Sequence, residues 1–290
     1  MRDLLAQGEL VEEALSGAGL RSVRLKGWHT VTAGWWADPA ERTMTDLDVL
    51  VAASDADRAA RALADAGYVP IRSGHTAFAD HELAPVHLPG RAGSVEIHTA
   101  LAVSRWAGVL PASAVLTAPG AMSSTDAVTH LIVHAQLHDE GHLLGRVPLR
   151  AVHELAVLSR LDLAGEIDWD VIRSRFGSVG AEPALDGFLT LARSMFDADV
   201  PPPHPRFVPF VPHAVAATAM MDRPRLATLY ARLVYLPRAL SATRMRSLFP
   251  GRPVWRSRLG WVARGIGRWV RGVSRDETNH AGCDVGEPVE

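Results

Sequence analysis

DLDVLV, at residues 46–51, places two aspartates at the head of an apolar strand. Because side chains alternate between the two faces of a strand, Asp46 and Asp48 project from the same face, and the apolar residues around them enter the core. Two neighbouring carboxylates repel each other, and a divalent cation removes that repulsion. Mg²⁺ takes carboxylate and phosphate oxygens together, so the pair predicts a magnesium site on this strand.

A second apolar stretch, VEIHTAL at residues 95–101, predicts another strand with Glu96 and His98 on one face. If this strand pairs beside residues 46–51, three carboxylates converge on one point. That convergence is the geometry of two-metal phosphoryl transfer. The alternative is a row of solvated acids at the end of a strand.

Lys26 is the single lysine among 30 basic residues, and it stands in the stretch VRLKG at 23–27. This stretch predicts a short strand with Arg24 and Lys26 on one face. A compact, rotatable ammonium differs from the planar fork of arginine, so position 26 is a candidate functional site. The alternative is that one lysine survives by chance.

The order of the predicted elements defines the fold class. Strands alternate with helices at 3–17, 28–36 and 55–66, and the pattern becomes helical after about residue 122. We therefore expect an α/β (α+β) fold, in which a small mixed-sheet domain precedes a mostly helical domain. The later helices are expected at 126–138, 149–161, 168–176 and 184–196. The expected parts are an α/β domain 1–120, a helical domain 121–200, a Pro-rich connector 201–212, C-terminal helices 213–275 and a disordered acidic tail 276–290.

Composition excludes several classes of protein. The 290 residues are 48% hydrophobic and 21% charged, which describes a globular chain and not a disordered one. Cys283 is the one cysteine, so a disulfide framework is excluded. No targeting segment opens the chain, and no stretch reaches the ~20 apolar residues that a bilayer requires. We expect a cytoplasmic protein without a transmembrane segment.

The basic residues gather near the C-terminus. Residues 244–275 hold nine arginines and no acid, and 255–275 predicts an amphipathic basic helix. This helix is a candidate for contact with an anionic partner, such as RNA phosphates, a membrane surface or an acidic protein. The alternative is a closing helix that packs its tryptophans on the bundle and leaves its arginines in solvent.

The ordered motifs resemble the DNA polymerase β-like nucleotidyltransferase superfamily. Within it, the chain is most similar to an uncharacterised bacterial nucleotidyltransferase family, over roughly residues 20–195. The motifs are Leu25-Lys26-Gly27, Arg42, Asp46 to Val51, a helix ending in Gly67-Tyr68, and Val95-Glu96-Ile97-His98. The resemblance extends through the histidines of HLIVHAQLH and the stretch VHELAVL.

The resemblance implies a nucleotidyltransferase-like α/β domain with a defined set of roles. Asp46 and Asp48 would bind metal, and Glu96 would bind a second metal or draw the proton from the attacking hydroxyl. Lys26 and Gly27 would stand where the superfamily keeps its Gly-Ser phosphate loop, although Trp28 follows Gly27 here. Arg42 would reach the β- and γ-phosphates. His98, on the face of Glu96, joins the expected nucleotide- and phosphate-binding set.

A stripe of histidines adds to the same expectation. His130, His134 and His138 recur at four-residue spacing and share one helical face. The resemblance implies that His134 and His138 line the cleft opposite the carboxylates and bind nucleotide or phosphate. The alternative is that they pack between helices. The segment HDEGH at 138–142 departs from the zinc-protease signature, because Gly141 would break the helix, so we expect no zinc hydrolase.

These observations favour a metal-dependent nucleotidyltransferase with Mg²⁺ or Mn²⁺ as cofactor and an NTP as donor. It would move a nucleoside monophosphate to an acceptor hydroxyl or phosphate and release pyrophosphate. The sequence does not identify the acceptor: a peptide or small natural product is favoured, and sugars, proteins and tRNA are the alternatives. One alternative is a phosphoryl or sugar-phosphate transferase that uses the same carboxylates. Another is a non-catalytic nucleotide-binding scaffold.

Overall fold

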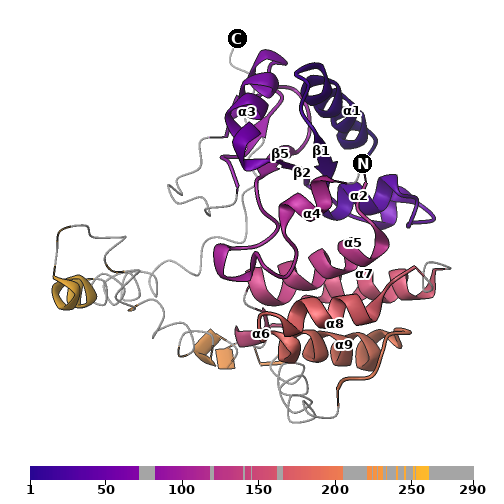
Figure 1. Ribbon diagram of the computed structural model, residues 1–290, viewed down its shortest axis with the longest axis vertical. Helices are drawn as coiled ribbons and strands as arrows, with labels where there is room; N and C mark the ends of the chain where they lie inside the picture. The colour runs from indigo at the N-terminus through magenta and orange to yellow at the C-terminus, as the bar shows by residue number, and fades with distance from the viewer. Residues whose placement is uncertain are drawn as a thin grey trace. The chain divides into compact units, whose positions relative to one another are not determined.

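A computed structural model (Figure 1) describes residues 1–71, 82–117, 121–139, 141–144, 146–161 and 166–204, together with short stretches between 221 and 260. The chain divides into two compact units, Met1–Ala227 and Thr228–Glu290. The fold and the candidate site described below belong to the first unit.

A mixed sheet lies at the centre of the N-terminal half. Its strands are β1 (Ser22–Arg24), β2 (Asp46–Val51), β3 (Val69–Pro70), β4 (Val86–His87) and β5 (Ser94–His98). The five strands run in the order β1-β2-β5-β4-β3. The pair of β2 with β5 is parallel, whereas the other pairs are antiparallel. The expected mixed sheet is therefore confirmed, and so is the neighbouring position of the two acidic strands.

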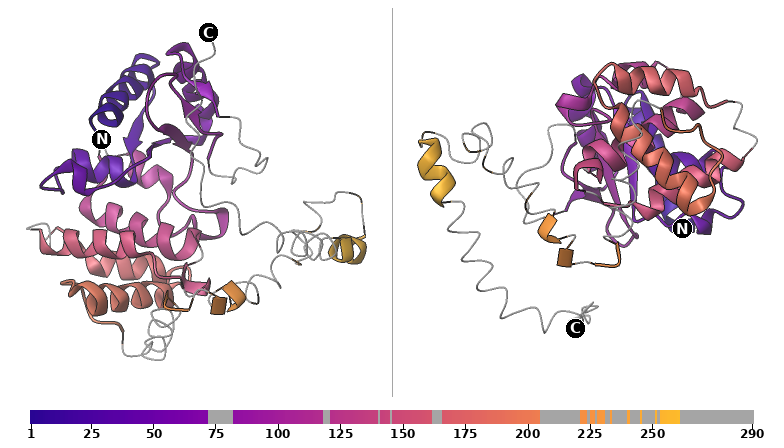
Figure 2. Two further views of the ribbon diagram at one scale, coloured as in Figure 1. Left: turned by 180° about the vertical axis from the view of Figure 1, so that it is seen from behind. Right: turned by 90° about the horizontal axis from the view of Figure 1, so that it is seen from below.

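Helices cover both faces of this sheet, and more helices follow it. The α-helices are α1 (Arg2–Gly17), α2 (Lys26–Thr32), α3 (Ala56–Asp65), α4 (Ala112–Leu116), α5 (Ser124–Ile132), α6 (Gly141–Leu144), α7 (Leu149–Arg160), α8 (Trp169–Gly177) and α9 (Glu182–Phe196). Figure 1 shows α1 and α3 on one side of the sheet, and α5, α7, α8 and α9 stacked beyond the other side. The rear view in Figure 2 shows the same sequence of layers.

The alternation along β2 explains these layers. Leu47 and Val49 point to α1 and α3, where they join a buried cluster that includes Leu15. Leu50 points the other way and joins a larger cluster that extends through α5, α7 and α9. A strand covered on both faces reads as an almost continuous apolar run, which is why DLDVLV is buried from its second residue onward. The division into domains at residue 120 stays a prediction.

Around Lys26 the structure differs from the expected strand 23–27. The strand ends at Arg24, although the Leu25 amide still donates to the Asp48 carbonyl at 2.9 Å. The backbone turns at Lys26, whose φ is 48°, and α2 begins there instead of at residue 28. A positive φ at a residue other than glycine costs about 1 kcal/mol or more. Because lysine has no preference for this conformation, the sequence did not predict the turn.

The helix expected at 126–138 is two elements. An α-helix runs over Ser124–Ile132, and Val133–His138 continues it as a wider π-helix. The strand expected at 95–101 ends at His98. The helices expected at 149–161, 168–176 and 184–196 are confirmed to within two residues.

The C-terminal expectations fall mostly beyond the described residues. Residues 201–204 form no helix or strand, and the rest of the expected connector lies outside the described part. Residues 254–260 are helical, but the remainder of the basic segment 255–275 and the tail 276–290 also lie outside it. Across the described chain, no helix combines the length and the apolarity needed to cross a bilayer.

Candidate active site

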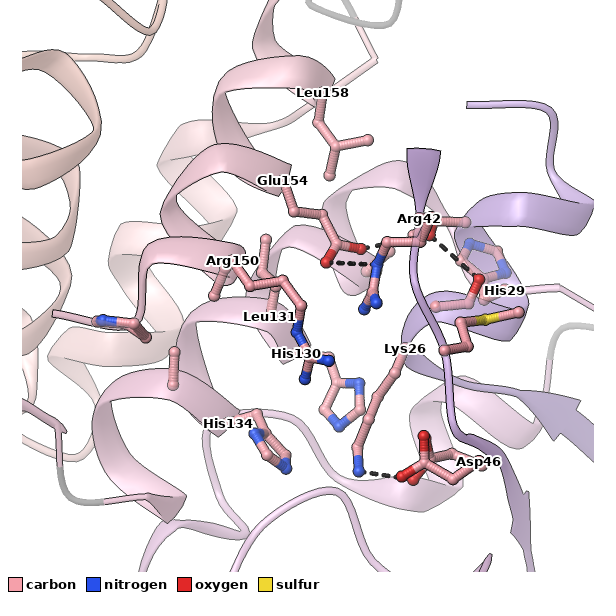
Figure 3. A pocket seen from close by; sticks show the side chains of 18 of the residues that line it. Lys26, His29, Arg42, Asp46, His130, Leu131, His134, Arg150, Glu154 and Leu158 are labelled. Carbon is pink, nitrogen blue, oxygen red and sulfur yellow. Dashed lines mark hydrogen bonds and ion pairs between the residues drawn. The ribbon is translucent and has the colours of Figure 1, made fainter. Parts of the chain in front are cut away.

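A cavity of about 420 Å³ opens between β2, α2 and the helices that follow the sheet. Figure 3 shows Lys26, Asp46 and His134 converging at one end of it, while Arg42 and Glu154 pair at the other. Leu131 and Leu158 line its helical side. The cavity therefore has an acidic sheet wall, defined here as Asp46 and Asp48 of β2, and a helical wall, defined as the lining residues of α5, the π-helix and α7.

The parallel pairing of β2 and β5 assembles the three predicted acids. Asp48 lies opposite Glu96 in the register, and Asp46 lies opposite Ser94. By the alternation along each strand, Asp46, Asp48 and Glu96 share one face. Asp46 and Asp48 line the cavity, whereas Glu96 stands beside Asp48 without being part of the cavity lining.

Asp48 is the electrostatic centre of this face. Its side chain is 3% exposed, and its Oδ1 lies 2.6 Å from the Lys26 ammonium and 2.8 Å from Nε2 of His98. Burial alone would raise the pKa of Asp48, but the hydrogen bond from His98 and the charge of Lys26 hold that pKa well below its usual range. Burial would lower the pKa of Lys26, but Asp48 outweighs it and raises that pKa. Asp48 is therefore a carboxylate at neutral pH, and Lys26 an ammonium.

Glu96 behaves differently from Asp48. Burial and the negative charges of Asp48 and Asp46 raise the pKa of Glu96, and the positive charges of Lys26 and His98 offset this only in part. Repulsion among the acids therefore persists although two cationic groups stand beside them. Asp46 has no lysine or arginine in ion-pair contact within the described residues; its one side-chain hydrogen bond there comes from Thr45.

This donor set fits a hard divalent cation. Three carboxylates on one face offer only oxygen ligands, which suit Mg²⁺ or Mn²⁺. Burial first, and then the charges of Asp48 and Asp46, raise the pKa of Glu96, and a bound cation would offset the repulsion among these acids. The ligand atoms that lie within 4.8 Å of one another are those of Asp48, Glu96 and His98, and Asp46 is not part of this group.

Gly27 permits the close approach of the loop that carries Arg42. A Cβ at Gly27 would lie 2.7 Å from Sδ of Met44 and 3.0 Å from Cζ of Arg42. A larger residue would displace the side chains of Met44 and Arg42. The glycine of the Leu-Lys-Gly motif thus has a packing role beside the cavity. The neighbouring Lys26 places a positive charge in the cavity lining.

Arg42 lies in the cavity lining but is already paired. Its Nε donates to Oε2 of Glu154 at 3.0 Å, and its Nη1 donates to the Thr43 carbonyl at 2.7 Å. Both side chains are buried, and the Thr30 hydroxyl donates to the other oxygen of Glu154 at 3.3 Å. Among the described residues, no protein acceptor bonds Nη2 of Arg42. The pair joins the loop before β2 to α7.

The helical wall presents imidazoles toward the acidic wall. His130 and His134 line the cavity, with ring centroids 6.2 Å apart. Burial, reinforced by the positive charges of His134 and Lys26, lowers the pKa of His130 well below its usual value. His138 stacks on His134 at 4.8 Å but is not part of the cavity lining. His98 was predicted to bind nucleotide or phosphate. It lies at the end of β5, where its Nε2 contacts the Asp48 carboxylate.

Several lining residues have no place in the sequence-based site, among them Glu154, His29 and Asp139. Glu154 was visible only as part of VHELAVL, a helix pattern that gives no sign of a buried ion pair. Within the described part of the chain, the buried Nε2 of His29 has no hydrogen-bond partner, and burial lowers the pKa of His29 to about 4. Asp139 follows the histidine stripe directly, so its position beside His138 was the one available signal.

The mixed sheet, the carboxylates on one face and the helical wall together match the nucleotidyltransferase class that the motifs predict. The chain belongs to a family described as uncharacterised nucleotidyltransferases, which matches residues 1–197. The match confirms the family inferred from the ordered motifs. No curated protein and no solved structure matches the chain.

Proposed function

We propose that this chain is a Mg²⁺-dependent nucleotidyltransferase that transfers a nucleoside monophosphate from an NTP to an acceptor hydroxyl or phosphate. An acceptor oxygen forms a bond to the α-phosphorus, and the bond from that phosphorus to the bridging oxygen of the β-phosphate breaks. Pyrophosphate leaves with the electron pair of that bond. The observation that carries the proposal is the acidic face of β2 and β5 at the edge of a cavity that also holds Lys26.

In this proposal Asp46 and Asp48 hold the metal, and Glu96 either binds a second metal or takes the proton of the acceptor hydroxyl. Mg²⁺ bound there would neutralise phosphate charge and align the attacking and leaving oxygens. Glu96 has a raised pKa, so it accepts a proton more readily than an ordinary carboxylate, which suits it to take the proton of an acceptor hydroxyl. Asp48 stays ionised because Lys26 and His98 hold its pKa low.

The cationic groups of the cavity would bind the triphosphate. Lys26 contacts Asp48 and lines the cavity, so its rotatable ammonium can serve a carboxylate and a phosphate oxygen together. Nη2 of Arg42 donates to no described protein group, so its N–H groups would bind a phosphate oxygen. His134 lies on the opposite wall, where it can donate to a phosphate oxygen.

We infer a small acceptor group for the helical side of the cavity. The whole cavity measures about 420 Å³ and would also hold the triphosphate, so the space left suits only a small acceptor group, such as part of a small natural product or one residue of a peptide. Leu131 and Leu158 would contact its apolar part, whereas the hydroxyl or phosphate would face Asp46.

Nucleotide-dependent stabilisation of the full chain tests the proposal without knowledge of the acceptor. A ligand at a hundredfold excess over its Kd adds about 2.7 kcal/mol of stability. For a unit of this size that is a rise in Tm of roughly 5 °C or more. The rise should require both Mg²⁺ and an NTP, and Asp46→Asn should remove most of it. If none of the four NTPs raises the Tm in the presence of Mg²⁺ or Mn²⁺, the result would favour the scaffold alternative.

A further inference from the structure

The π-helix Val133–His138 ends in a cluster that the proposed function does not use as a unit. The Asp139 amide donates to the His134 carbonyl at 2.9 Å, which closes the wide turn. Wide turns of this kind recur at functional sites, because they bring side chains together that a regular α-helix keeps apart. Here the turn brings His134, His138 and Asp139 to one place.

The three side chains present their ligand atoms to a common point. Nδ1 of His134 lies 3.3 Å from Oδ2 of Asp139, and Nε2 of His138 lies 3.9 Å from Oδ1 of the same carboxylate. The two rings are stacked, with centroids 4.8 Å apart and an interplanar angle of 23°. One ligand atom from each residue falls within 4.8 Å of the others. Ligand atoms around a tetrahedral zinc ion lie roughly 3.4 Å apart, so small side-chain rotations complete the set.

The backbone around Asp139 is fixed by a glycine. At Gly141 an added Cβ would lie 2.3 Å from the Ala135 carbonyl oxygen, so only glycine fits there. Gly141 therefore packs directly against the π-helix at Ala135. The Asp139 carboxylate itself lies near both imidazoles.

The donor atoms differ in kind from those of the sheet. Two imidazole nitrogens and one carboxylate oxygen form the donor set of zinc and other first-row transition metals. On the sheet, the carboxylates of Asp46, Asp48 and Glu96 make the set rich in oxygen, with one nitrogen from His98, and an oxygen-rich set suits Mg²⁺. The two walls of the cavity are thus suited to two different metals.

We propose that His134, His138 and Asp139 bind one divalent transition metal of the zinc class on the helical wall. His134 and Asp139 line the cavity, so the metal would keep an open coordination position facing it. That position would take an oxygen ligand from the cavity. The site is independent of nucleotidyl transfer, since it requires none of the sheet carboxylates.

Zinc titration of the full chain, without a polyhistidine tag and without nucleotide, tests this site. A chromophoric chelator in competition should report one equivalent bound with a Kd below about 1 μM. His134→Ala and His138→Gln should each weaken binding by at least about 100-fold, because loss of even an outer-shell partner costs 10–100-fold. Co²⁺ should give an absorption spectrum of low-symmetry coordination that both variants lose.

Matched variants separate this site from the sheet. His87→Ala removes a histidine of β4 outside the cluster and should leave zinc affinity unchanged. Asp46→Asn with Asp48→Asn should also leave it unchanged. Zinc affinity that survives both His134→Ala and His138→Gln, or that is lost with the aspartate pair, would overturn the proposal. So would the absence of saturable binding in the wild-type chain.

Discussion

The two walls of the cavity are built by different means. On the sheet wall, Asp46 and Asp48 stand where the alternation of a strand puts them, and the parallel register brings Glu96 beside Asp48. On the helical wall, His134 and Asp139 meet because a π-helix widens the turn, and Glu154 reaches Arg42 across 112 positions of sequence. The sheet wall is negative and paired with Lys26, whereas the helical wall is rich in imidazole. In the proposed function the sheet wall would hold the metal, and the helical wall would contact the acceptor.

The largest effect should follow loss of the sheet carboxylates. Asp46→Asn with Asp48→Asn removes two ligands of the proposed metal, so pyrophosphate release from NTP should fall on the order of 10⁴-fold, about 10² for each group. Asp65→Asn, an exposed acid at the end of α3, is the matched control and should keep full activity. A folded double variant with unchanged turnover would remove the sheet wall from the reaction. Circular dichroism and a melting curve establish that the variant is folded.

Glu154→Gln separates the helical wall from the loop of Arg42. It leaves the Arg42 guanidinium buried without its carboxylate, and breaking such a pair costs about 3–5 kcal/mol. Urea denaturation should report this loss in the free energy of unfolding. Asp55→Ala breaks the exposed pair with Arg58 and should cost no more than about 1 kcal/mol. Equal losses of unfolding free energy in Glu154→Gln and Asp55→Ala would show that the Arg42–Glu154 pair does not stabilise the contact between the Arg42 loop and α7.

His29 should make stability depend on pH. Its folded pKa of about 4 lies below its ordinary value of 6.5, because burial disfavours the charged ring. As the pH falls, His29 therefore binds a proton in the unfolded chain at a higher pH than in the folded chain. The stabilisation is present above about pH 6.5 and is lost as pH falls toward 4, by about 3 kcal/mol in total.

Denaturation curves between pH 7 and 4 measure this dependence. His29→Gln has no titrating ring, so its stability should fall by about 3 kcal/mol less over the same range. His130, whose pKa is also lowered by burial, remains in both proteins and cancels in the difference. Parallel pH profiles of the two proteins would contradict the assignment of a neutral His29.

The smallest effect is expected from Lys26→Arg. The planar guanidinium keeps the charge but cannot reproduce the 2.6 Å contact of the ammonium with Asp48 together with a phosphate contact. The stabilisation by Mg²⁺ and NTP should fall by about 1 kcal/mol, the size of one net hydrogen bond. Arg24→Lys, the reverse exchange at the strand end outside the cavity lining, should leave it unchanged. A Lys26→Arg variant with full nucleotide stabilisation would show that the ammonium does not contact the triphosphate.

The sheet wall could be predicted from sequence, because period two and strand pairing follow from local pattern. DLDVLV appears with its predicted bounds, and Glu96 lies opposite Asp48. The turn at Lys26 could not be predicted, because lysine, unlike glycine, has no preference for a positive φ such as the 48° observed here. The π-helix was likewise hidden, because one extra residue in a turn leaves the helical pattern of histidines intact. The pair of Arg42 and Glu154 depends on tertiary contact alone.

Equilibrium binding of Mn²⁺ in the presence of NTP, followed by electron paramagnetic resonance, tests directly which wall holds the nucleotide metal. The wild-type chain should bind Mn²⁺ more tightly when an NTP is present, because phosphate and carboxylate oxygens share the ion. Asp46→Asn should abolish this nucleotide-dependent binding, whereas His134→Ala should retain it. Retention in Asp46→Asn together with loss in His134→Ala would contradict the account, since it would assign the nucleotide metal to the helical wall.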